Sequence, residues 1–134
     1  MTTPPQPALP CAHLEKTFSQ ADFDAFARLS GDNNPIHCDP GFAAGTRFGR
    51  TVAHGALLCA VLRRLVEDLY PGARQLGQNT QYPAPSPVGE ALRFDVETTG
   101  RPEAANRRRI ALSLTVTRLL DGVTTCTGTT EIEV

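Results

Sequence analysis

The central part of this 134-residue chain carries an apolar run with helical spacing. From Val52 to Leu62 the residues are apolar almost all round apart from His54, and beyond Leu62 charged residues alternate with leucines at helical spacing. Pro71-Gly72 then supplies a stop signal. The pattern predicts one helix that is buried at its start, amphipathic at its end and enclosed by the rest of the domain.

The second half of the chain changes to the alternating pattern of β-strands. Apolar and polar residues alternate over 92–97 and 110–117, and Asp121-Gly122 is a hairpin signal that leads into a further strand at 124–134. A weaker strand is expected at 75–82, where a proline-rich stretch cuts it off. These elements predict the α+β class, with a single antiparallel sheet wrapped around the long helix.

The first third of the chain indicates a leader followed by a short capped helix. Residues 1–12 are rich in proline, so we expect a loose leader there and one folded domain over residues 13–134. The capping signature Ser19-Gln20-Ala21-Asp22 predicts the start of the helix, and Ser30-Gly31 predicts its end. Residues 38–50 contain three glycines and one proline, which predicts loops and a short turn or helix.

Composition narrows the classes of partner. The formal net charge of −1 argues against a nucleic-acid or acidic-lipid partner, because both need a strongly basic face. No apolar run approaches the roughly 20 residues of a membrane span, and no signal peptide is visible, so a cytoplasmic location is expected. The four cysteines are scattered without C-x-x-C or zinc-finger spacing, which predicts reduced thiols.

Asp32 and His37 are candidates for acid–base chemistry. They flank Asn33-Asn34-Pro35-Ile36, in a segment predicted to leave one helix without beginning another, and Pro35 restricts its backbone. A stiff loop holds two side chains at a fixed separation, and a carboxylate and an imidazole can together accept and donate a proton near neutral pH. Taken singly, the two residues also fit an Asx turn and a solvated loop histidine, so the residues alone leave both interpretations open.

Three longer strings connect these residues to a known family. Ser30-Gly31-Asp32-Asn33-Asn34-Pro35-Ile36-His37 closely resembles the hydratase signature of the MaoC-like family, which includes the (R)-specific enoyl-CoA hydratases. Thr46-Arg47-Phe48-Gly49-Arg50-Thr51-Val52-Ala53-His54-Gly55 resembles the family's segment leading into its central helix. Gln78-x-x-x-Tyr82-x-x-Pro85-x-x-x-Gly89-Glu90 is a weaker match, in which the family usually has Phe and Asp in place of Tyr82 and Glu90. The resemblance covers about residues 15–134.

The resemblance implies a hot-dog fold, a bent antiparallel sheet around a long central helix, usually paired sheet to sheet as a homodimer. It implies that Asp32 and His37 are the catalytic pair and hold a water for addition across the C2–C3 double bond of a trans-2-enoyl thioester. Asp32 is favoured as the base and His37 as the acid, with the order left open.

By the same resemblance, the N–H of Gly55 forms the oxyanion hole. Its predicted place at the N-terminus of the buried helix agrees, because free N–H groups and the positive end of the helix dipole meet there. The alternative interpretation is that the glycine only allows tight packing of the helix start, and both can hold.

Four further residues are candidate substrate-binding positions: His54, Arg47, Arg50 and Tyr82. For His54 three roles stay open: orienting the loop of His37, lining the pocket, or being a satisfied buried histidine, of which the last is favoured. Arg47, Arg50 and the run 107–109 are candidates for the phosphates of coenzyme A, although a solvated turn is the expected role of the run. Tyr82 precedes a proline-rich stretch, and if this stretch borders the acyl pocket, substrate choice is expected to differ from that of the short-chain members.

We expect neither a metal site nor a cofactor, since coenzyme A enters as part of the substrate. His37, Asp39 and His54 are suitable metal ligands, but their spacing matches no metal motif and hydration needs no metal. Cys38 adjoins His37 and would point elsewhere if His37 faces the site, so a Cys–His nucleophile is not expected.

The leading hypothesis is a hydro-lyase that works as a homodimer on acyl-CoA thioesters: an (R)-specific enoyl-CoA hydratase, equivalently a 3-hydroxyacyl-CoA dehydratase. The alternatives are a hot-dog acyl-CoA thioesterase, a hydratase acting on acyl-carrier-protein thioesters, and a protein that binds acyl thioesters or supports a catalytic partner. Release of free thiol separates hydrolysis from hydration, and the intact Asp32, His37 and Gly55 argue against a purely supporting role.

Overall fold

The computed structural model describes residues 9–100 and 108–134. In this part of the chain the elements, in order, are β1 (Cys11–Thr17), α1 (Gln20–Ser30), α2 (Pro35–Cys38), α3 (Pro40–Ala44), α4 (Gly55–Leu69), β2 (Arg74–Gln81), β3 (Ala91–Gly100), β4 (Arg109–Arg118) and β5 (Thr124–Glu133). The long helix and the four strands β2 to β5 lie where the hydrophobic pattern predicts them.

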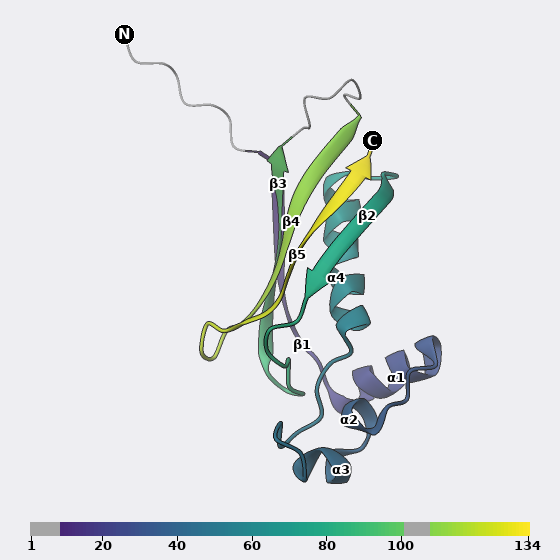
Figure 1. Ribbon diagram of the computed structural model, residues 1–134, viewed down its shortest axis with the longest axis vertical. Helices are drawn as coiled ribbons and strands as arrows, with labels where there is room; N and C mark the ends of the chain where they lie inside the picture. Colours follow the sequence, from purple (N-terminus) through teal and green to yellow (C-terminus); the bar gives the residue numbers. More distant parts are fainter. Residues whose placement is uncertain (1–8, 101–107) are drawn as a thin grey trace.

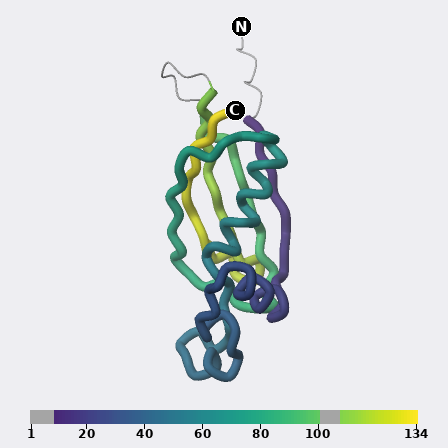
Figure 2. The backbone as a smooth tube through the Cα atoms, turned by 90° about the vertical axis from the view of Figure 1, so that its right-hand side faces the viewer, coloured from purple at the N-terminus to yellow at the C-terminus, as the bar shows by residue number. Residues whose placement is uncertain are grey.

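The five strands form one antiparallel sheet in the order β1-β3-β4-β5-β2. Helix α4 runs along one face of this sheet, and α1, α2 and α3 gather beyond one end of it (Figure 1). Seen from the side, α4 lies between the two edge strands β1 and β2, so the sheet curves around the helix (Figure 2). This is the predicted architecture of a sheet wrapped around a central helix.

The core lies between α4 and the inner face of the sheet. Leu58, Leu62, Leu65 and Val66 of α4 are buried, and they belong to one cluster with the inward-facing residues of the strands: Leu92, Phe94, Val96, Ile110, Leu112, Leu114, Val116, Cys126 and Ile132. Complete burial of a side chain of this size contributes roughly 1.5–3 kcal/mol, so this layer anchors α4 and its N-terminus. No helix of the described residues is both long and apolar enough to cross a membrane.

The predicted caps of α1 are confirmed. Ser19 and Asp22 form a reciprocal capping box at its start, and Gly31 ends it in the left-handed conformation at φ 80°. Phe23 is completely buried and ties the helix to the core. The segment that follows Gly31 therefore leaves α1 from a fixed point.

The structure differs from the sequence prediction at two places in the N-terminal half. Strand β1 was not predicted, and it begins at Cys11, inside the range 1–12 assigned to the leader, of which residues 1–8 lie outside the described residues. It is an edge strand with mostly exposed residues, so it lacks a strong alternating pattern. The prediction that no helix begins between Asp32 and His37 is wrong, because Pro35 starts the one-turn helix α2 with Asn34 as its N-cap.

Candidate active site

The segment from Ser30 to His37 folds by local hydrogen bonds from its own polar side chains. Ser30 Oγ accepts the N–H of Asp32 at 3.1 Å, and Asp32 Oδ1 accepts the N–H of Asn34 at 3.3 Å. Asn34 Oδ1 then accepts the N–H of Ile36 at 3.1 Å and caps α2. Polar turn residues thus set the course of the backbone between α1 and α2.

This course brings Asp32 and His37 together. Asp32 Oδ2 lies 3.8 Å from His37 Nε2, with the carboxylate side chain 55% exposed and the imidazole side chain 14% exposed. His37 Nδ1 lies 2.8 Å from the carbonyl oxygen of Val52, and because a carbonyl only accepts, Nδ1 carries the proton of the neutral ring. The unprotonated Nε2 therefore faces the carboxylate.

His54 lies behind this pair and links it to α4. It is the N-cap residue of α4, it is 1% exposed, and its Nε2 donates to the backbone carbonyl of Asp32 at 2.9 Å. Its ring stacks on that of His37, with centroids 3.8 Å apart and planes at 23°. The bond to Asp32 agrees with orientation of the loop, and the 1% exposure agrees with a buried histidine, although its Nδ1 has no partner among the described residues. His54 is not among the residues that line the cavity described below, and its role stays a prediction.

The potential metal ligands at this place are Asp32, His37 and His54, whose donor atoms lie within 4.8 Å of one another. Asp39, a member of the set considered from the sequence, instead accepts the N–H of Phe42 and caps α3. The two stacked imidazoles each have one nitrogen bound to a backbone carbonyl, and their remaining lone pairs lie in nearly parallel ring planes. Such lone pairs do not converge on one ion, so this donor set fits a metal poorly.

Gly55 is the first residue of α4, and the ring of Tyr82 covers it. A Cβ on residue 55 would lie 2.6 Å from Tyr82 Cζ, which is closer than such atoms approach in proteins. A side chain at residue 55 would therefore force the Tyr82 ring to move, in agreement with the interpretation that the glycine allows tight packing at the helix start. The role of its N–H as an oxyanion donor stays a prediction.

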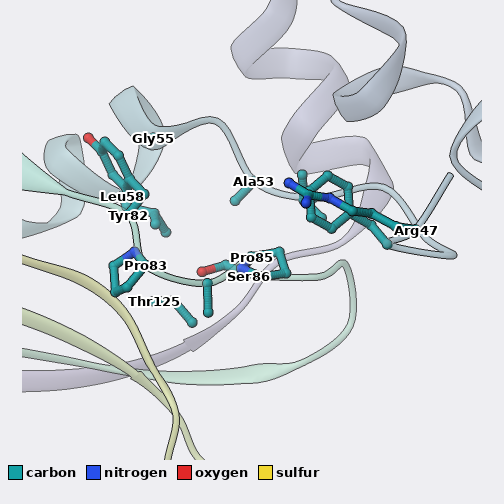
Figure 3. A pocket seen from close by; sticks show the side chains of 12 residues that line it. Arg47, Ala53, Gly55, Leu58, Tyr82, Pro83, Pro85, Ser86 and Thr125 are labelled. Atoms are coloured by element: carbon teal, nitrogen blue, oxygen red, sulfur yellow. The ribbon is translucent and has the colours of Figure 1, made fainter.

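A cavity of about 370 Å³ opens beside the first turn of α4. Its lining comes from the segment before α4, from α4 itself, from the segment after β2 and from β5: Arg47, Phe48, Val52, Ala53, Gly55, Leu58, Tyr82, Pro83, Ala84, Pro85, Ser86 and Thr125. Figure 3 shows Tyr82 on one side of this cavity and Arg47 on the opposite side. A mostly apolar hollow with a few polar groups is typical of a small-molecule site.

The structure places only some of the predicted site residues at this cavity. Gly55, Arg47 and Tyr82 line it, whereas Asp32, His37 and His54 gather next to it, joined to it through the backbone of Val52 and the start of α4. Arg50 forms an ion pair with Glu90 at 2.5 Å. In the run 107–109, Arg109 pairs with Glu131 and residue 107 lies outside the described residues.

The sequence did not indicate the hydrogen bonds around Cys59, one helical turn after Gly55. Tyr82 Oη lies 3.0 Å from Cys59 Sγ, and Gln78 Nε2 donates to the same sulfur at 3.2 Å. Hydrogen bonding from Cys126, assisted by Tyr82, lowers the pKa of Cys59 to about 5, against desolvation. Burial, followed by the hydrogen bond to Cys59, raises the pKa of Tyr82 to about 12. Tyr82 is thus a neutral donor that is anchored over Gly55.

A family model described as MaoC like domain matches residues 5–119. The chain belongs to the MaoC-like family. This MaoC-like chain is 42% identical over 94 residues to the (R)-specific enoyl-CoA hydratase of Aeromonas caviae, covering 69% of this chain and 70% of the relative. It is 36% identical over 107 residues to the 3-hydroxybutyryl-CoA dehydratase of Methylorubrum extorquens, covering 77% and 67%.

The fold of this MaoC-like chain is also that of a solved relative. The structure titled (R)-hydratase from A. caviae involved in PHA biosynthesis superposes with a TM-score of 0.87 at 32% identity, over 98% of this chain and 99% of that one. The resemblance to the MaoC-like family and the predicted hot-dog fold are therefore confirmed.

Proposed function

We propose that this MaoC-like protein is an (R)-specific enoyl-CoA hydratase, a hydro-lyase that adds water across the C2–C3 double bond of trans-2-enoyl-CoA. The observation that carries the proposal is the approach of Asp32 Oδ2 to within 3.8 Å of His37 Nε2 beside the first turn of a buried helix. The two relatives described above act in the same reaction class, one named a hydratase and the other a dehydratase.

The Asp32–His37 pair is arranged to hold one water. Two acceptors, a carboxylate oxygen and the unprotonated Nε2 of His37, lie close enough to bind the two protons of a single water molecule. A water held in this way turns an oxygen lone pair toward the substrate. One acceptor removes a proton as the oxygen bonds to C3, and the same pair returns that proton to C2, so that the net change is addition of one water.

Addition at C3 moves negative charge onto the thioester oxygen, and Gly55 is the proposed donor to that oxygen. Gly55 is the first residue of α4, where N–H groups point out of the helix and the helix dipole is positive. A preorganised donor at such a place typically contributes about 100- to 1,000-fold in rate. His54 connects both parts of the site, because it occupies the N-cap position of α4, without a side-chain capping bond, and its ring donates to the carbonyl of Asp32.

Arg47 is the proposed partner of the coenzyme A phosphates. It lies at the side of the cavity opposite Tyr82, with its guanidinium 4.9 Å above the ring of Phe48 (Figure 3). A guanidinium held on an aromatic ring is well suited to bind phosphate oxygens. No separate cofactor is part of the proposal.

We further propose a homodimer in the cytoplasm. Strand β2 is an edge of the sheet with mostly exposed residues, and such an edge pairs readily with a second copy of itself. Sedimentation equilibrium should then give twice the 14.4 kDa mass of one chain, and a monomer at all concentrations would rule the pairing out. All four cysteines are free thiols, which agrees with a reducing compartment.

The test is the loss of crotonyl-CoA absorbance, with the enantiomers of the 3-hydroxy product resolved. Asp32→Asn and His37→Ala should each lower kcat by roughly 1,000-fold or more, as expected when a member of an acid–base pair is removed. The matched controls are Asp39→Asn, which retains an N-cap side chain at α3, and His13→Ala on the exposed face of β1. Hydration at the wild-type rate by both Asp32→Asn and His37→Ala would contradict the proposal. Release of free coenzyme A in place of hydration would contradict it as well.

A further inference from the structure

Ser86 has a feature that the proposed hydration does not use. Its residue is 3% exposed, and its hydroxyl oxygen has no hydrogen-bond partner among the described residues. Buried hydroxyls without a partner are rare in folded proteins, because they lose their bonds to water on burial. Two other buried polar atoms share this state, His54 Nδ1 and Arg63 Nη1, but Ser86 is the one whose residue lines the cavity.

The backbone holds Ser86 rigidly at the cavity. It stands between Pro85 and Pro87, whose rings restrict the chain on both sides. The carbonyl of Pro85 accepts from Arg118 Nη1 at 3.0 Å, and the carbonyl of Ser86 accepts the N–H of Ala53 at 2.9 Å. A hydroxyl on such a support is presented in a fixed position, which is the property of a binding group.

The surroundings of Ser86 point to the kind of group that it binds. Ala53, which binds its carbonyl, is two residues before Gly55, and Gly55 lines the same cavity (Figure 3). The other two hydroxyls of the lining already have partners: that of Thr125 donates to the carbonyl of Val116, and that of Tyr82 lies 3.0 Å from Cys59 Sγ. Ser86 thus carries the one hydroxyl of the described lining that has no partner, and this hydroxyl can donate to a carbonyl oxygen that enters the cavity beside the start of α4.

We propose that Ser86 is a substrate-binding residue whose hydroxyl donates a hydrogen bond to a carbonyl oxygen of the acyl thioester. The inference rests on the proposed function, because it takes an acyl thioester as the occupant of the cavity. Two carbonyls of this substrate class meet the description: that of the thioester, and that of the first amide of the pantetheine arm. The choice between them decides whether Ser86 acts on the reaction or on binding of the carrier.

The test compares Ser86→Ala with the wild-type protein on two substrates. One is crotonyl-CoA, and the other is the crotonyl thioester of ethanethiol, which has the thioester carbonyl but no amide. Loss of one neutral hydrogen bond should lower kcat/KM by roughly three- to tenfold. A decrease with both substrates assigns Ser86 to the thioester carbonyl, and a decrease with crotonyl-CoA alone assigns it to the amide.

Stability provides the second readout. Since Ser86 Oγ makes no bond within the described protein, Ser86→Ala should melt at the same or a higher temperature, unlike the loss of a structural hydroxyl. Ser113→Ala, a matched change on the β4 face opposite the buried Leu112 and Leu114, should leave kcat/KM unchanged. Unchanged kinetics with both thioesters, or a lower melting temperature with unchanged affinity, overturns the proposal.

A binding measurement separates this inference from the proposed reaction. Butyryl-CoA is a saturated analogue that cannot be hydrated, and calorimetry gives its Kd. If the wild-type protein binds it but fails to hydrate crotonyl-CoA, the proposed function fails. Ser86→Ala still tests the inference in that case, with a roughly three- to tenfold weaker Kd expected and an equal Kd overturning it.

Discussion

Tyr82 lies across Gly55 with its ring so close to the backbone that a Cβ on residue 55 would meet Tyr82 Cζ at 2.6 Å. The ring is held there by its hydroxyl, which lies 3.0 Å from Cys59 Sγ one turn further along α4. Two separate reasons for a glycine therefore meet at one residue: room for Tyr82, and free approach of a thioester to the N–H. They can be separated, because only the first depends on Tyr82.

Gly55→Ala should destabilise the protein by roughly 1–3 kcal/mol, because the added methyl overpacks the contact with Tyr82. In a Tyr82→Ala background the same substitution should cost little stability, since the clashing ring is gone. Hydration of crotonyl-CoA should nevertheless stay at least roughly tenfold slower than in Tyr82→Ala alone, because the methyl still crowds the N–H. Urea denaturation and steady-state kinetics of the four proteins measure both effects. If Gly55→Ala in the Tyr82→Ala background had the same hydration rate and stability as Tyr82→Ala alone, packing would be the only reason for the glycine.

His54 is predicted to act as a positioning residue. His54→Phe retains a ring against His37 and removes the donor to the carbonyl of Asp32. We expect kcat for crotonyl-CoA to fall by roughly tenfold at a KM within about twofold of wild type, because the aspartate loses its orientation while the cavity is unchanged. The free energy of unfolding should change by less than about 1 kcal/mol, because the substitution also removes the unpartnered Nδ1.

The conservative variant His54→Gln serves as the control for this prediction. Its amide nitrogen reaches about as far as Nε2 and restores a donor to the carbonyl of Asp32. It should therefore recover part of the kcat that His54→Phe loses. Equal kcat values in the two variants would show that the hydrogen bond has no part in orienting the site.

Local patterns predicted most of the fold and part of the candidate site. Caps such as Ser19 and Gly31 act on their own neighbours, and the Asp32–His37 approach arises within eight residues, so both are encoded locally. The contact of Tyr82 with Cys59 spans 23 residues and the pairing of Arg50 with Glu90 spans 40. Partners this far apart are set by the tertiary packing of separate segments, which the pattern along one strand or helix does not contain.

Strand β1 and Ser86 were missed for related reasons. β1 is an exposed edge whose pairing with β3 supplies the stability that its own residues lack. Ser86 has no distinguishing neighbour in the sequence beyond prolines, and only the folded chain shows that it is buried, unpartnered and at a cavity. A hydroxyl that is proposed to bind substrate because it has no partner in the fold cannot be recognised from a sequence motif.

Cys59 should react as a thiolate well below the usual pH of cysteine. Because hydrogen bonding by Cys126 lowers its pKa to about 5, its alkylation by iodoacetamide should keep a constant rate down to about pH 6. Peptide mass spectrometry over a pH series gives the rate at this residue, and a short cysteine peptide provides the reference. A rate that declines about tenfold per pH unit below pH 8 would contradict the prediction.

The same pKa predicts how stability depends on pH. The folded pKa of about 5 lies below the ordinary cysteine pKa of 9.0, so between these values the unfolded chain binds more protons at Cys59 than the folded protein does. The contribution of Cys59 is therefore fully present above about pH 9 and is lost as the pH falls through about 5. Urea denaturation of wild type and Cys59→Ser should show a difference in unfolding free energy that shrinks on acidification, and a constant difference would oppose this.

Arg47 and Arg50 are predicted to differ in their effect on carrier binding, although the sequence offered both as partners of phosphate. Arg47 lines the cavity with its guanidinium over Phe48, whereas Arg50 is already paired with Glu90. Arg47→Ala should raise KM for crotonyl-CoA by roughly five- to tenfold at a kcat within about twofold of wild type, because a charge-assisted contact to phosphate is lost in ground and transition state alike.

The ethanethiol thioester and the Arg50→Ala variant complete this test. A substrate without phosphates should show the same KM with Arg47→Ala as with wild type, and added salt should reduce the difference seen with crotonyl-CoA, because ions screen an exposed phosphate contact. Arg50→Ala should raise KM for crotonyl-CoA by less than about twofold, because the Arg50 guanidinium is already paired with Glu90. The substitution should lower the free energy of unfolding by about 0–1 kcal/mol, because this ion pair is partly exposed. If the two alanine variants raise KM equally, the phosphates lie nearer Arg50 than the cavity indicates, and Glu90 must release Arg50 when the carrier binds.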